Sequence, residues 1–330
     1  MSTKTVAITG GAGFIGAYLV RRFAQSGYHV VVIDNFLRGT PARLDGVSNI
    51  TLTNVDILDL NQLIEATKGC EAIFHLAAIN GTENFYTIPD TILEVGVRGM
   101  FNVLDACKAN NIKELVVASS AEAYQDPEQI PTPELVVLKV PDPKNPRYSY
   151  GASKLISEVL AMNFYRDHFE KLQIFRPHNI YGPDMGTKHV IPQFIIRALN
   201  LIDQANGSDV LFDIQGDGDE TRAFCYIDDL IEAFWAMYHH GGHREIYHLG
   251  NPEEVSIKQV VDSVFKNVSP TYQLNHLPIT AGSVGRRCPD IAKVAALGYR
   301  PLVNLNEGVR RTYDWYKAHR EVSQNVNQLI

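Results

Sequence analysis

The sequence predicts an α/β fold in which a doubly wound parallel sheet precedes a smaller, mixed α/β domain. Over residues 5–179, short apolar runs rich in Val, Ile and Leu alternate with helical patterns. Such runs are typical of parallel strands buried on both faces, and their alternation with helices favours the doubly wound arrangement. After residue 183 the pattern changes to more helices and scattered short strands. We expect one domain over residues 1–180 and a second over 181–330. The chain can cross back from the second domain to the first.

The elements of the first domain follow from their local patterns. The predicted strands are mostly continuous apolar runs, at residues 5–9, 29–34, 50–56, 72–78, 114–120 and 172–179. The predicted helices carry apolar residues at helical spacing, at residues 16–27, 60–69 and 91–110. A proline-rich segment, 126–147, precedes a further helix over 150–168. A loop of this length inside a compact domain is either disordered or functional, for example as a lid over a site.

Composition limits the possible functions. The 330 residues include 45% hydrophobic and 20% charged residues, which is usual for a globular protein. The formal net charge of −7 argues against a general nucleic-acid binder, which would need a basic face, so we expect no nucleic-acid partner. No apolar run is long enough to span a bilayer, and the N-terminus enters a strand pattern without a signal-peptide core. We therefore expect a cytoplasmic protein with no membrane partner.

Four cysteines, Cys70, Cys107, Cys225 and Cys288, are far apart in the sequence and lack the close spacing of metal ligands. This pattern is typical of reduced thiols in a cytoplasmic protein, and we expect no metal site.

A glycine pattern directly after the first strand predicts a dinucleotide site of the Rossmann type. Gly11, Gly13 and Gly16 have the spacing G-x-G-x-x-G at the point where strand 5–9 gives way to a helix. Glycine is needed here because the turn is tight, the backbone must approach a pyrophosphate, and the helix must pack closely on the sheet.

Two carboxylates follow the next two strands. Asp34 ends the second strand, where it can accept hydrogen bonds from ribose hydroxyls and would repel a 2′-phosphate. The sequence therefore favours NAD over NADP, although Arg38 lies close by. Asp56 ends the third strand, where it either contacts the adenine or caps the strand end.

A tyrosine and a lysine four residues apart open the helix after the proline-rich segment. Tyr150 and Lys154 have the i, i+4 spacing that places two side chains on one helical face. A nearby ammonium group favours tyrosinate and lowers the tyrosine pKa from about 10, and a cationic nicotinamide would lower it further. Downstream of a dinucleotide motif and a fifth strand that ends in serines, this pair is a candidate catalytic base.

With these motifs, the chain resembles the extended short-chain dehydrogenase/reductase family, in particular its nucleotide-sugar epimerases and dehydratases. The resemblance covers essentially the whole chain. Besides Asp34 and Asp56, it rests on TGGAGFIG (9–16), HLAA (75–78), SSAEAY (119–124), YGASK (150–154), RPHNIYGP (176–183), GDGDETRAFCYIDDL (216–230) and RRCPDIAKVAALGYRP (286–301).

The resemblance implies NAD as the cofactor and a catalytic set of three residues. Tyr150 would remove the proton of the sugar 4-hydroxyl while C4 gives hydride to NAD⁺, which is regenerated within the turnover. Lys154 would lower the pKa of Tyr150 and hold the nicotinamide ribose, and Ser120 would hydrogen-bond the same sugar hydroxyl. The cofactor contacts that it implies are Gly10, Gly11, Gly13, Phe14, Ile15, Gly16, Asp34, Asn35, Asp56, Ile57, Leu76, Ala77, Ala78, Ser119, Tyr150, Lys154 and Pro177.

The resemblance also assigns a nucleotide-diphosphate sugar as the substrate and the second domain as its main binding region. Its diphosphate would be held by Asn179, Arg222, Arg287 and Asp290. Guanidinium groups suit this task because their planar forks match phosphate oxygens. His178 and His189 border the region and are expected to be structural or close to the substrate. Related enzymes pair through two helices, here 91–110 and 150–168, which implies a homodimer.

The reaction depends on Glu122 and on Ala121 before it. A 4-epimerase needs only Ser120, Tyr150 and Lys154, because the 4-keto sugar turns over and takes hydride back on its other face. A 4,6-dehydratase also needs a base for the C5 proton and an acid to expel the C6 hydroxyl. In the dTDP-glucose dehydratases an Asp–Glu pair does this, and here Ala121 replaces the Asp.

Other subfamilies are matched incompletely too. GDP-mannose dehydratases and UDP-glucuronate decarboxylases carry Ser-Glu at these positions, and GDP-mannose 3,5-epimerases have a cysteine in this segment. We therefore expect an NAD-dependent nucleotide-sugar epimerase acting through oxidation at C4, most simply a 4-epimerase. The alternatives are a dehydratase or uronate decarboxylase that uses Glu122 as a catalytic residue, 3,5-epimerase-like chemistry, or a catalytically silent NAD-binding regulator.

Overall fold

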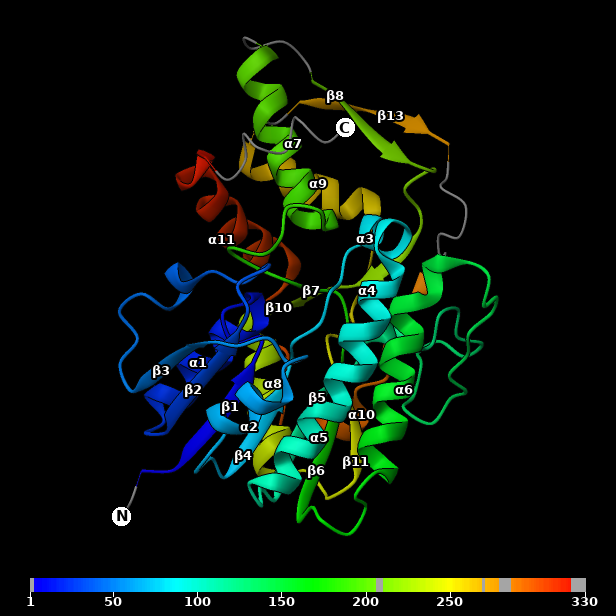
Figure 1. Ribbon diagram of the computed structural model, residues 1–330. Coiled ribbons are helices and arrows are strands. Elements are labelled where there is room, and N and C mark those ends of the chain that lie inside the picture. The colour runs from blue at the N-terminus through cyan, green and yellow to red at the C-terminus, as the bar shows by residue number, and fades with distance from the viewer. Residues whose placement is uncertain (1–2, 206–209, 269–270, 279–285, 322–330) are drawn as a thin grey trace.

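The structure is a computed structural model that describes residues 3–205, 210–268, 271–278 and 286–321. Within these ranges the main sheet contains seven strands in the order β11-β6-β5-β4-β1-β2-β3 (Figure 1), and every neighbouring pair runs parallel. Its strands are β1 Thr5–Thr9, β2 His29–Asp34, β3 Ile50–Asn54, β4 Ala72–His75, β5 Glu114–Ala118, β6 Lys171–Pro177 and β11 Glu245–Leu249. The strand order reverses at β1, which confirms the predicted doubly wound fold.

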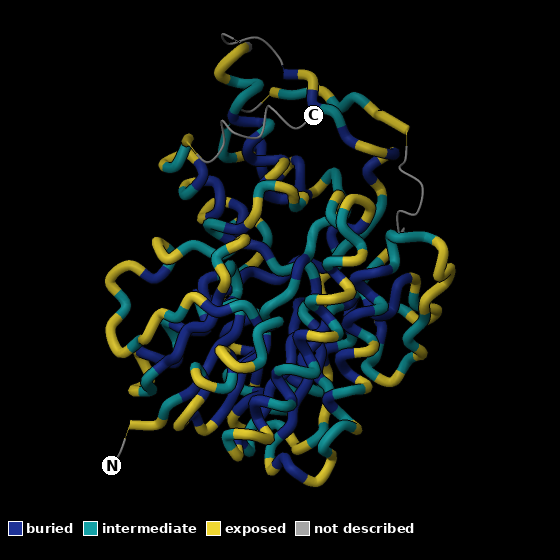
Figure 2. Tube along the Cα trace, viewed as in Figure 1, coloured by how far each residue is buried: buried dark blue, intermediate teal, exposed yellow. Residues whose placement is uncertain are grey.

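Helices cover both faces of this sheet. The helices α1 Phe14–Gln25 and α8 Ile227–His240 pack on one face, and α2 Leu60–Ala66, α5 Gly99–Ala109 and α6 Ser149–Asn163 pack on the other. Successive residues of a strand point to opposite faces, so Val32 joins the first core cluster and Ile33 the second. Figure 2 shows the buried residues concentrated along the sheet between these layers. The strands are apolar on both faces because both faces are covered.

The edge strand β11 comes from the second half of the sequence. It pairs with β6 from Glu245 opposite Gln173 to Leu249 opposite Pro177. The helix α8 precedes it and packs against α1. Residues 227–249 therefore return to the main sheet, as the expectation of a chain that crosses back allowed.

A smaller, mixed part lies beyond the carboxyl ends of the strands (Figure 1). Its helices are α7 Val190–Ala205, α9 Ile257–Val268 and α11 Leu305–Ala318. Its short strands form three small sheets among the described residues, made of β7 Ile180–Tyr181 with β10 Cys225–Tyr226, β8 Val210–Gln215 with β13 Tyr272–Leu277, and β9 Thr221–Ala223 with β12 Glu254–Ser256 and β14 Arg286–Arg287. This agrees with the predicted mixed α/β second part.

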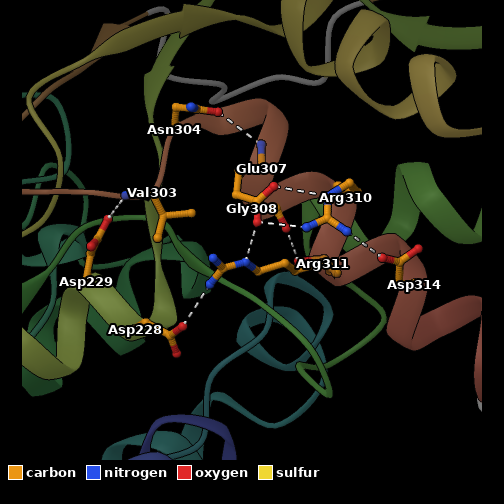
Figure 3. Close-up of polar contacts among 10 residues, drawn as sticks. Asp228, Asp229, Val303, Asn304, Glu307, Gly308, Arg310, Arg311 and Asp314 are labelled. Carbon is orange, nitrogen blue, oxygen red and sulfur yellow. Dashed lines mark hydrogen bonds and ion pairs between the residues drawn. The ribbon is translucent and has the colours of Figure 1, made fainter.

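The C-terminal helix α11 is fastened to α8 of the main domain (Figure 3). The buried carboxylate of Asp229 accepts hydrogen bonds from the backbone N–H groups of Leu302 and Val303, both at 3.0 Å. Arg311 of α11 forms an ion pair with Asp228 at 3.3 Å. The buried backbone contacts hold the two parts together more firmly than the exposed ion pair, because exposed pairs are screened by water.

The predicted helix 91–110 is wrong in one respect, because it is interrupted. The chain forms α4 Pro89–Leu93, then a π-helical turn, Glu94–Arg98, and then α5. Gly96 in the turn lies so close to α6 that an added Cβ would be 2.6 Å from the Cβ of Ser153. The hydroxyl of Ser157 donates to the Gly96 carbonyl at 3.0 Å, which satisfies an acceptor that the turn frees. Packing against α6 thus stabilises the interruption.

Other boundaries differ by a few residues. The helix predicted over 150–168 ends at Asn163, and several strands end before their predicted last residues because the polar ends turn into loops at the site. The remaining short elements are α3 Thr82–Thr87, α10 Ala292–Ala295 and the 3-10 turns Pro41–Leu44, Ala121–Ala123 and Pro146–Tyr148. All four cysteines are buried with free thiols. In the described part of the chain, no helix is both long and apolar enough to cross a membrane.

Candidate active site

The glycine-rich turn between β1 and α1 leaves no room for side chains. Gly10 has φ +69°, and a Cβ added there would lie 2.8 Å from the backbone nitrogen of Ala77. A Cβ on Gly16 would lie 2.1 Å from the carbonyl oxygen of Gly10. The helix α1 then begins at Phe14, directly after the cap residue Gly13. A bare backbone that leads into a helix N-terminus fits a pyrophosphate, so these residues fit the phosphates of NAD.

The predicted ribose-binding residues meet next to this turn. Asp34 accepts the N–H of Ala12 at 3.0 Å and the N–H of Phe36 at 2.9 Å, so its carboxylate also shapes the turn. Asn35 donates its side-chain amide to Asp56 at 2.9 Å. The ends of β2 and β3 therefore bring Asp34, Asn35 and Asp56 together, where the sequence placed the adenosine half of NAD.

The other predicted cofactor residues divide into three groups. Leu76 and Ala77 donate their backbone N–H groups to Thr9, which holds the end of β4, with Ala78 next in the chain, beside the glycine turn. Four more of these residues are buried or partly buried. Phe14 and Ile15 pack against the core, Pro177 ends β6, and Gly11 lies in the glycine turn. Ile57 packs against Gly99 of α5, and the Ser119 hydroxyl donates to Glu158. The side chains of Ile57 and Ser119 are thus used inside the protein.

The predicted catalytic residues lie together at the carboxyl end of β5. Tyr150 and Lys154 are both buried near the start of α6. The Lys154 ammonium donates to the Ala118 carbonyl at 2.8 Å and lies 5.8 Å from the centre of the Tyr150 ring. The side chain of Ser120 lowers the pKa of Tyr150, and its Oγ accepts the N–H of Glu122 at 3.1 Å. The ring of Phe85 stacks on Tyr150 with centroids 5.4 Å apart and planes at 10°, which fixes the tyrosine ring.

Burial shifts the pKa values of Tyr150 and Lys154 in opposite directions, so that they end further apart. Burial raises the pKa of Tyr150 to about 12, although the hydrogen bond from Ser120 opposes the shift. Burial lowers the pKa of Lys154 to about 8, and the carboxylate of Glu158 opposes that shift. At neutral pH the protein alone therefore holds a phenol beside an ammonium ion. A cationic ring at this position would favour the tyrosinate.

Glu122 is held between two arginines. Its carboxylate pairs with Arg287 at 2.7 Å and with Arg147 at 3.2 Å. Burial raises the pKa of Glu122, but Arg287 and Arg147 outweigh burial, so that the pKa lies below its usual value. The sequence reasoning missed Arg147, whose only signal was its place three residues before Tyr150. Its guanidinium lies 5.1 Å from the centre of the Phe85 ring.

The predicted diphosphate residues come together only in part. Arg222 and Arg287 are direct neighbours on the paired strands β9 and β14. Burial lowers the pKa of Arg222, and the neighbouring Arg287 adds to this, as two cations in one place would. Such a pair is suited to an anion. Asn179 instead donates to the Ala223 carbonyl at 2.9 Å, and the carboxylate of Asp290 accepts the N–H of Ala292 at 2.8 Å.

The proline-rich segment 126–147 is anchored at its first half and at its end. Thr132 exchanges backbone hydrogen bonds with Cys288 at 2.9 Å and Asp290 at 2.8 Å. The segment's last residue, Arg147, binds Glu122, whereas Leu135 is 96% exposed. Its anchors are the strand end and the arginine segment that border the site. A lid role remains a prediction for the exposed middle.

A buried polar layer lies beneath the catalytic residues, and the sequence reasoning missed most of it. Its members join α6, β6, β11 and the chain after β5, namely Ser119, Tyr124, Glu158, Arg176 and His248. His178 is buried beside this layer, with its ring 4.6 Å from His248, and neither ring nitrogen has a hydrogen-bond partner among the described residues. Burial lowers the pKa of His178, as do His248, Arg287 and Arg176. The neutral ring supports a structural or substrate-adjacent place. His189 is half-buried, and desolvation and Arg38 lower its pKa.

The chain is similar to known proteins in both sequence and structure. The UDP-glucuronic acid decarboxylase 1 of Xenopus tropicalis is 31% identical over 99% of this chain and 75% of its own length. The UDP-glucose 4-epimerase of Thermotoga maritima, solved with UDP-glucose, has a TM-score of 0.83 at 26% identity and covers 96% of this chain and 99% of its own. DesIV of Streptomyces venezuelae, a dTDP-glucose 4,6-dehydratase solved with NAD, has a TM-score of 0.84 at 26% identity, covering 96% and 98%.

Residues 6–250 match the model of the NAD dependent epimerase/dehydratase family. That match spans the glycine turn, the predicted catalytic residues and the return to the main sheet in β11. The chain uses NAD and belongs to the NAD-dependent epimerase/dehydratase family of nucleotide-sugar enzymes.

Proposed function

We propose that the protein is a nucleotide-sugar 4-epimerase that works through transient oxidation at C4 of the sugar. The observation that carries the proposal is the state of Glu122. Ser120, Tyr150 and Lys154 are assembled for C4 oxidation, while Glu122 is bound in ion pairs with two arginines. A 4-epimerase needs the first three residues and no further base.

The proton steps fall to Tyr150. NAD, when bound, supplies the hydride acceptor for C4 and the hydride donor for the return. The oxygen of Tyr150 takes the proton of the sugar 4-hydroxyl as the C4–O bond becomes a carbonyl, and gives that proton back when the hydroxyl re-forms. Ser120, which lowers the pKa of Tyr150, binds the same sugar hydroxyl in this proposal. The Lys154 ammonium, fixed on the Ala118 carbonyl, stabilises the tyrosinate.

The second part of the chain holds the nucleotide in this proposal. Arg222 and Arg287 provide two guanidinium groups on adjacent strands for the diphosphate. Residues 1–180 carry the catalytic set, and 181–330 mainly bind the nucleotide diphosphate. When C4 has been oxidised, the sugar must rotate to offer its other face to the same hydride. A binding region anchored on the diphosphate, away from the sugar ring, permits that rotation.

Dehydratase chemistry is less well supported. A 4,6-dehydratase must remove the C5 proton and protonate the departing C6 hydroxyl. Ala121 offers a methyl group where an acid is required, and it is buried. Glu122 is a weak base because Arg287 and Arg147 hold its pKa below the usual value, against the effect of burial. Neither residue suits its part of the elimination.

Uronate decarboxylation is the second candidate, in a form that needs no free Glu122. A 4-keto uronate is a β-keto acid, and it loses carbon dioxide without a base at C5. Arg147 and Arg287, which both pair with Glu122, offer cations for a sugar carboxylate. The decarboxylase relative from Xenopus tropicalis supports this alternative through its overall likeness.

One experiment separates these reactions. The NAD-loaded enzyme is incubated in deuterium oxide with a panel of UDP-, GDP-, CDP- and dTDP-sugars, including uronates, and the products are analysed by mass spectrometry and NMR. A 4-epimerase yields an isomer without carbon-bound deuterium. A product lighter by water or by carbon dioxide would overturn the proposal, and deuterium in an isomer would indicate proton exchange beside the ketone, as in 3,5-epimerisation. Retained NAD without turnover would favour a catalytically silent relative.

We also infer a cytoplasmic homodimer that pairs through α4, α5 and α6. Apolar side chains are exposed on this surface, including Leu93 at 38%, Ile156 at 38% and Val159 at 53%. Exposed apolar side chains gathered on one face are typical of an interface. Light scattering coupled to size-exclusion chromatography tests the dimer, and Val159→Glu should shift it toward monomer.

A further inference from the structure

A fully buried ion pair lies directly behind the catalytic lysine. Glu158 on α6 and Arg176 on β6 are 4% and 2% exposed. The two nitrogens Nε and Nη2 of Arg176 donate to the two carboxylate oxygens of Glu158, at 2.8 and 2.5 Å. The hydroxyl of Ser119 also donates to this carboxylate. A carboxylate with this many donors is ionised and fixed in place.

The Glu158 carboxylate faces Lys154 along the helix. The two residues are four apart on α6, so their side chains lie on the same face. Tyr150 approaches the Lys154 ammonium from α6 as well, and His75 approaches it from the end of β4, where burial and then Lys154 lower the His75 pKa to about 3. His75 is thus uncharged, and Glu158 supplies the anion whose charge acts on Lys154.

Further contacts fix Arg176 from the other side. Its Nη1 donates to the hydroxyl of Tyr124 and, at 2.8 Å, to the carbonyl of Glu134. The ring nitrogen Nδ1 of His248 lies 3.0 Å from the carbonyl oxygen of Asp290, so Nδ1 carries the hydrogen. Nε2 of His248 therefore accepts from the Tyr124 hydroxyl at 2.6 Å. This chain of donors leaves Arg176 one orientation, which sets the place of the Glu158 carboxylate.

We propose that Glu158 is a positioning residue that keeps the buried Lys154 protonated. Arg176 holds the Glu158 carboxylate in place for this role. The inference rests on the proposed roles of Tyr150 and Lys154. Burial alone would strip the proton from an ammonium group near neutral pH, and a tyrosine beside a neutral amine would lose the charge that favours its ionised form. Arg38 also faces Tyr150, from the loop after β2.

The test measures kcat against pH for three variants of the NAD-loaded enzyme. Glu158→Gln removes the anion and leaves Arg176 unpaired, so the loss of activity at high pH should begin about one pH unit lower than in the wild type. Glu158→Gln combined with Arg176→Met removes both charges and guards against misfolding, because no unpaired buried charge remains. Its shift should be in the same direction but smaller, since the carboxylate is the nearer end of the pair. Asp229→Asn removes a buried carboxylate far from Lys154 and should leave the profile unmoved.

A second readout does not depend on turnover. The ultraviolet absorbance of tyrosinate in the NAD complex, with Tyr150→Phe as the blank, follows Tyr150 directly as the pH rises. In the Glu158 variants the ionisation of Tyr150 should weaken above the lowered lysine pKa. The inference would be overturned if kcat fell while its decline at high pH began at the same pH as in the wild type and the titration of Tyr150 was unchanged. If no nucleotide sugar is turned over, the proposed function fails while the absorbance titration still decides the role of Glu158.

Discussion

Tyr150 is the residue on which the chemistry depends most directly. Its ring is stacked on Phe85, and the side chain of Ser120 lowers its pKa. We expect Tyr150→Phe to lower kcat by roughly 10²–10⁴, the usual contribution of a positioned base, because no other group accepts the 4-hydroxyl proton. Steady-state kinetics measure this loss. Circular dichroism and NAD content serve as controls and should match the wild type.

Glu122 is the second single residue that distinguishes the possible reactions. Since it is paired with Arg147 and Arg287, we expect Glu122→Gln to keep kcat for epimerisation within about tenfold of the wild type, well above the loss caused by removing a catalytic base. Kinetics on the substrate found by the panel, measured beside Tyr150→Phe, provide the comparison. A loss as large as that of Tyr150→Phe would show that Glu122 transfers a proton after all.

The sequence could predict residues that act through local spacing. The glycine turn and the Tyr150–Lys154 pair are such patterns, and the structure brings Ser120 and both of these residues together. The sequence could not predict that Arg287 pairs with Glu122, because these residues are 165 positions apart and a carboxylate before a loop has many possible partners. Arg147 was missed for the same reason, since nothing in the chain near it pointed to Glu122.

At the scale of elements, the π-helical turn before α5 packs closely against α6 at Gly96. A side chain at this position would overlap Ser153, and it would also disturb the hydrogen bond from Ser157 to the Gly96 carbonyl. We expect Gly96→Val to reduce the free energy of unfolding by roughly 1–3 kcal/mol, the usual cost of overpacking, as measured by urea denaturation. Gly186→Ala is the matched control, because its nearest neighbour would be 3.7 Å away. Equal stability of both variants would contradict this reading of the contact.

This contact also explains the limit of prediction for elements. The spacing of apolar residues predicted one helix over 91–110. Such spacing carries no information about a distant segment that packs directly against a glycine of the helix. The π-helical turn exists because α6 presents Ser153 and Ser157 to it, and those residues lie about 60 positions further along the chain. Strand positions were easier to predict, since burial on both faces leaves a continuous apolar run in the sequence itself.

At the scale of the whole molecule, the fold class was predictable and the path of the chain was less so. Strand–helix alternation indicates a doubly wound sheet wherever it occurs. The strand β11, the last of the main sheet in chain order, follows a helix in the second half, where short strands of several small sheets are interspersed. Glu245–Leu249 is no more apolar than those strands, so its membership of the main sheet follows from pairing with β6 rather than from its own pattern.

Two buried histidines on strands of the main sheet make the stability of the whole molecule sensitive to acid. His75 and His248 are 3% and 0% exposed. Burial and Lys154 lower the pKa of His75 to about 3. Burial lowers the pKa of His248 to about 4, although the hydrogen bond to Asp290 opposes the shift. Both rings are therefore neutral in the folded protein at a pH where the unfolded chain binds protons.

The sign of the pH dependence follows from this difference. The unfolded chain takes up a proton at each histidine below about pH 6.5, and the folded protein does so only near pH 4 or 3, so stability falls as the pH drops through this window. Each histidine should contribute up to about 1.4 kcal/mol per pH unit. Urea denaturation at pH 7, 6 and 5 measures the slope. His248→Gln should make it shallower, and replacing the exposed His240 by Gln should leave it unchanged. Stability that is level from pH 7 to 5 would mean that the folded protein admits protons to these rings, and the buried layer beneath the site would then be open to water.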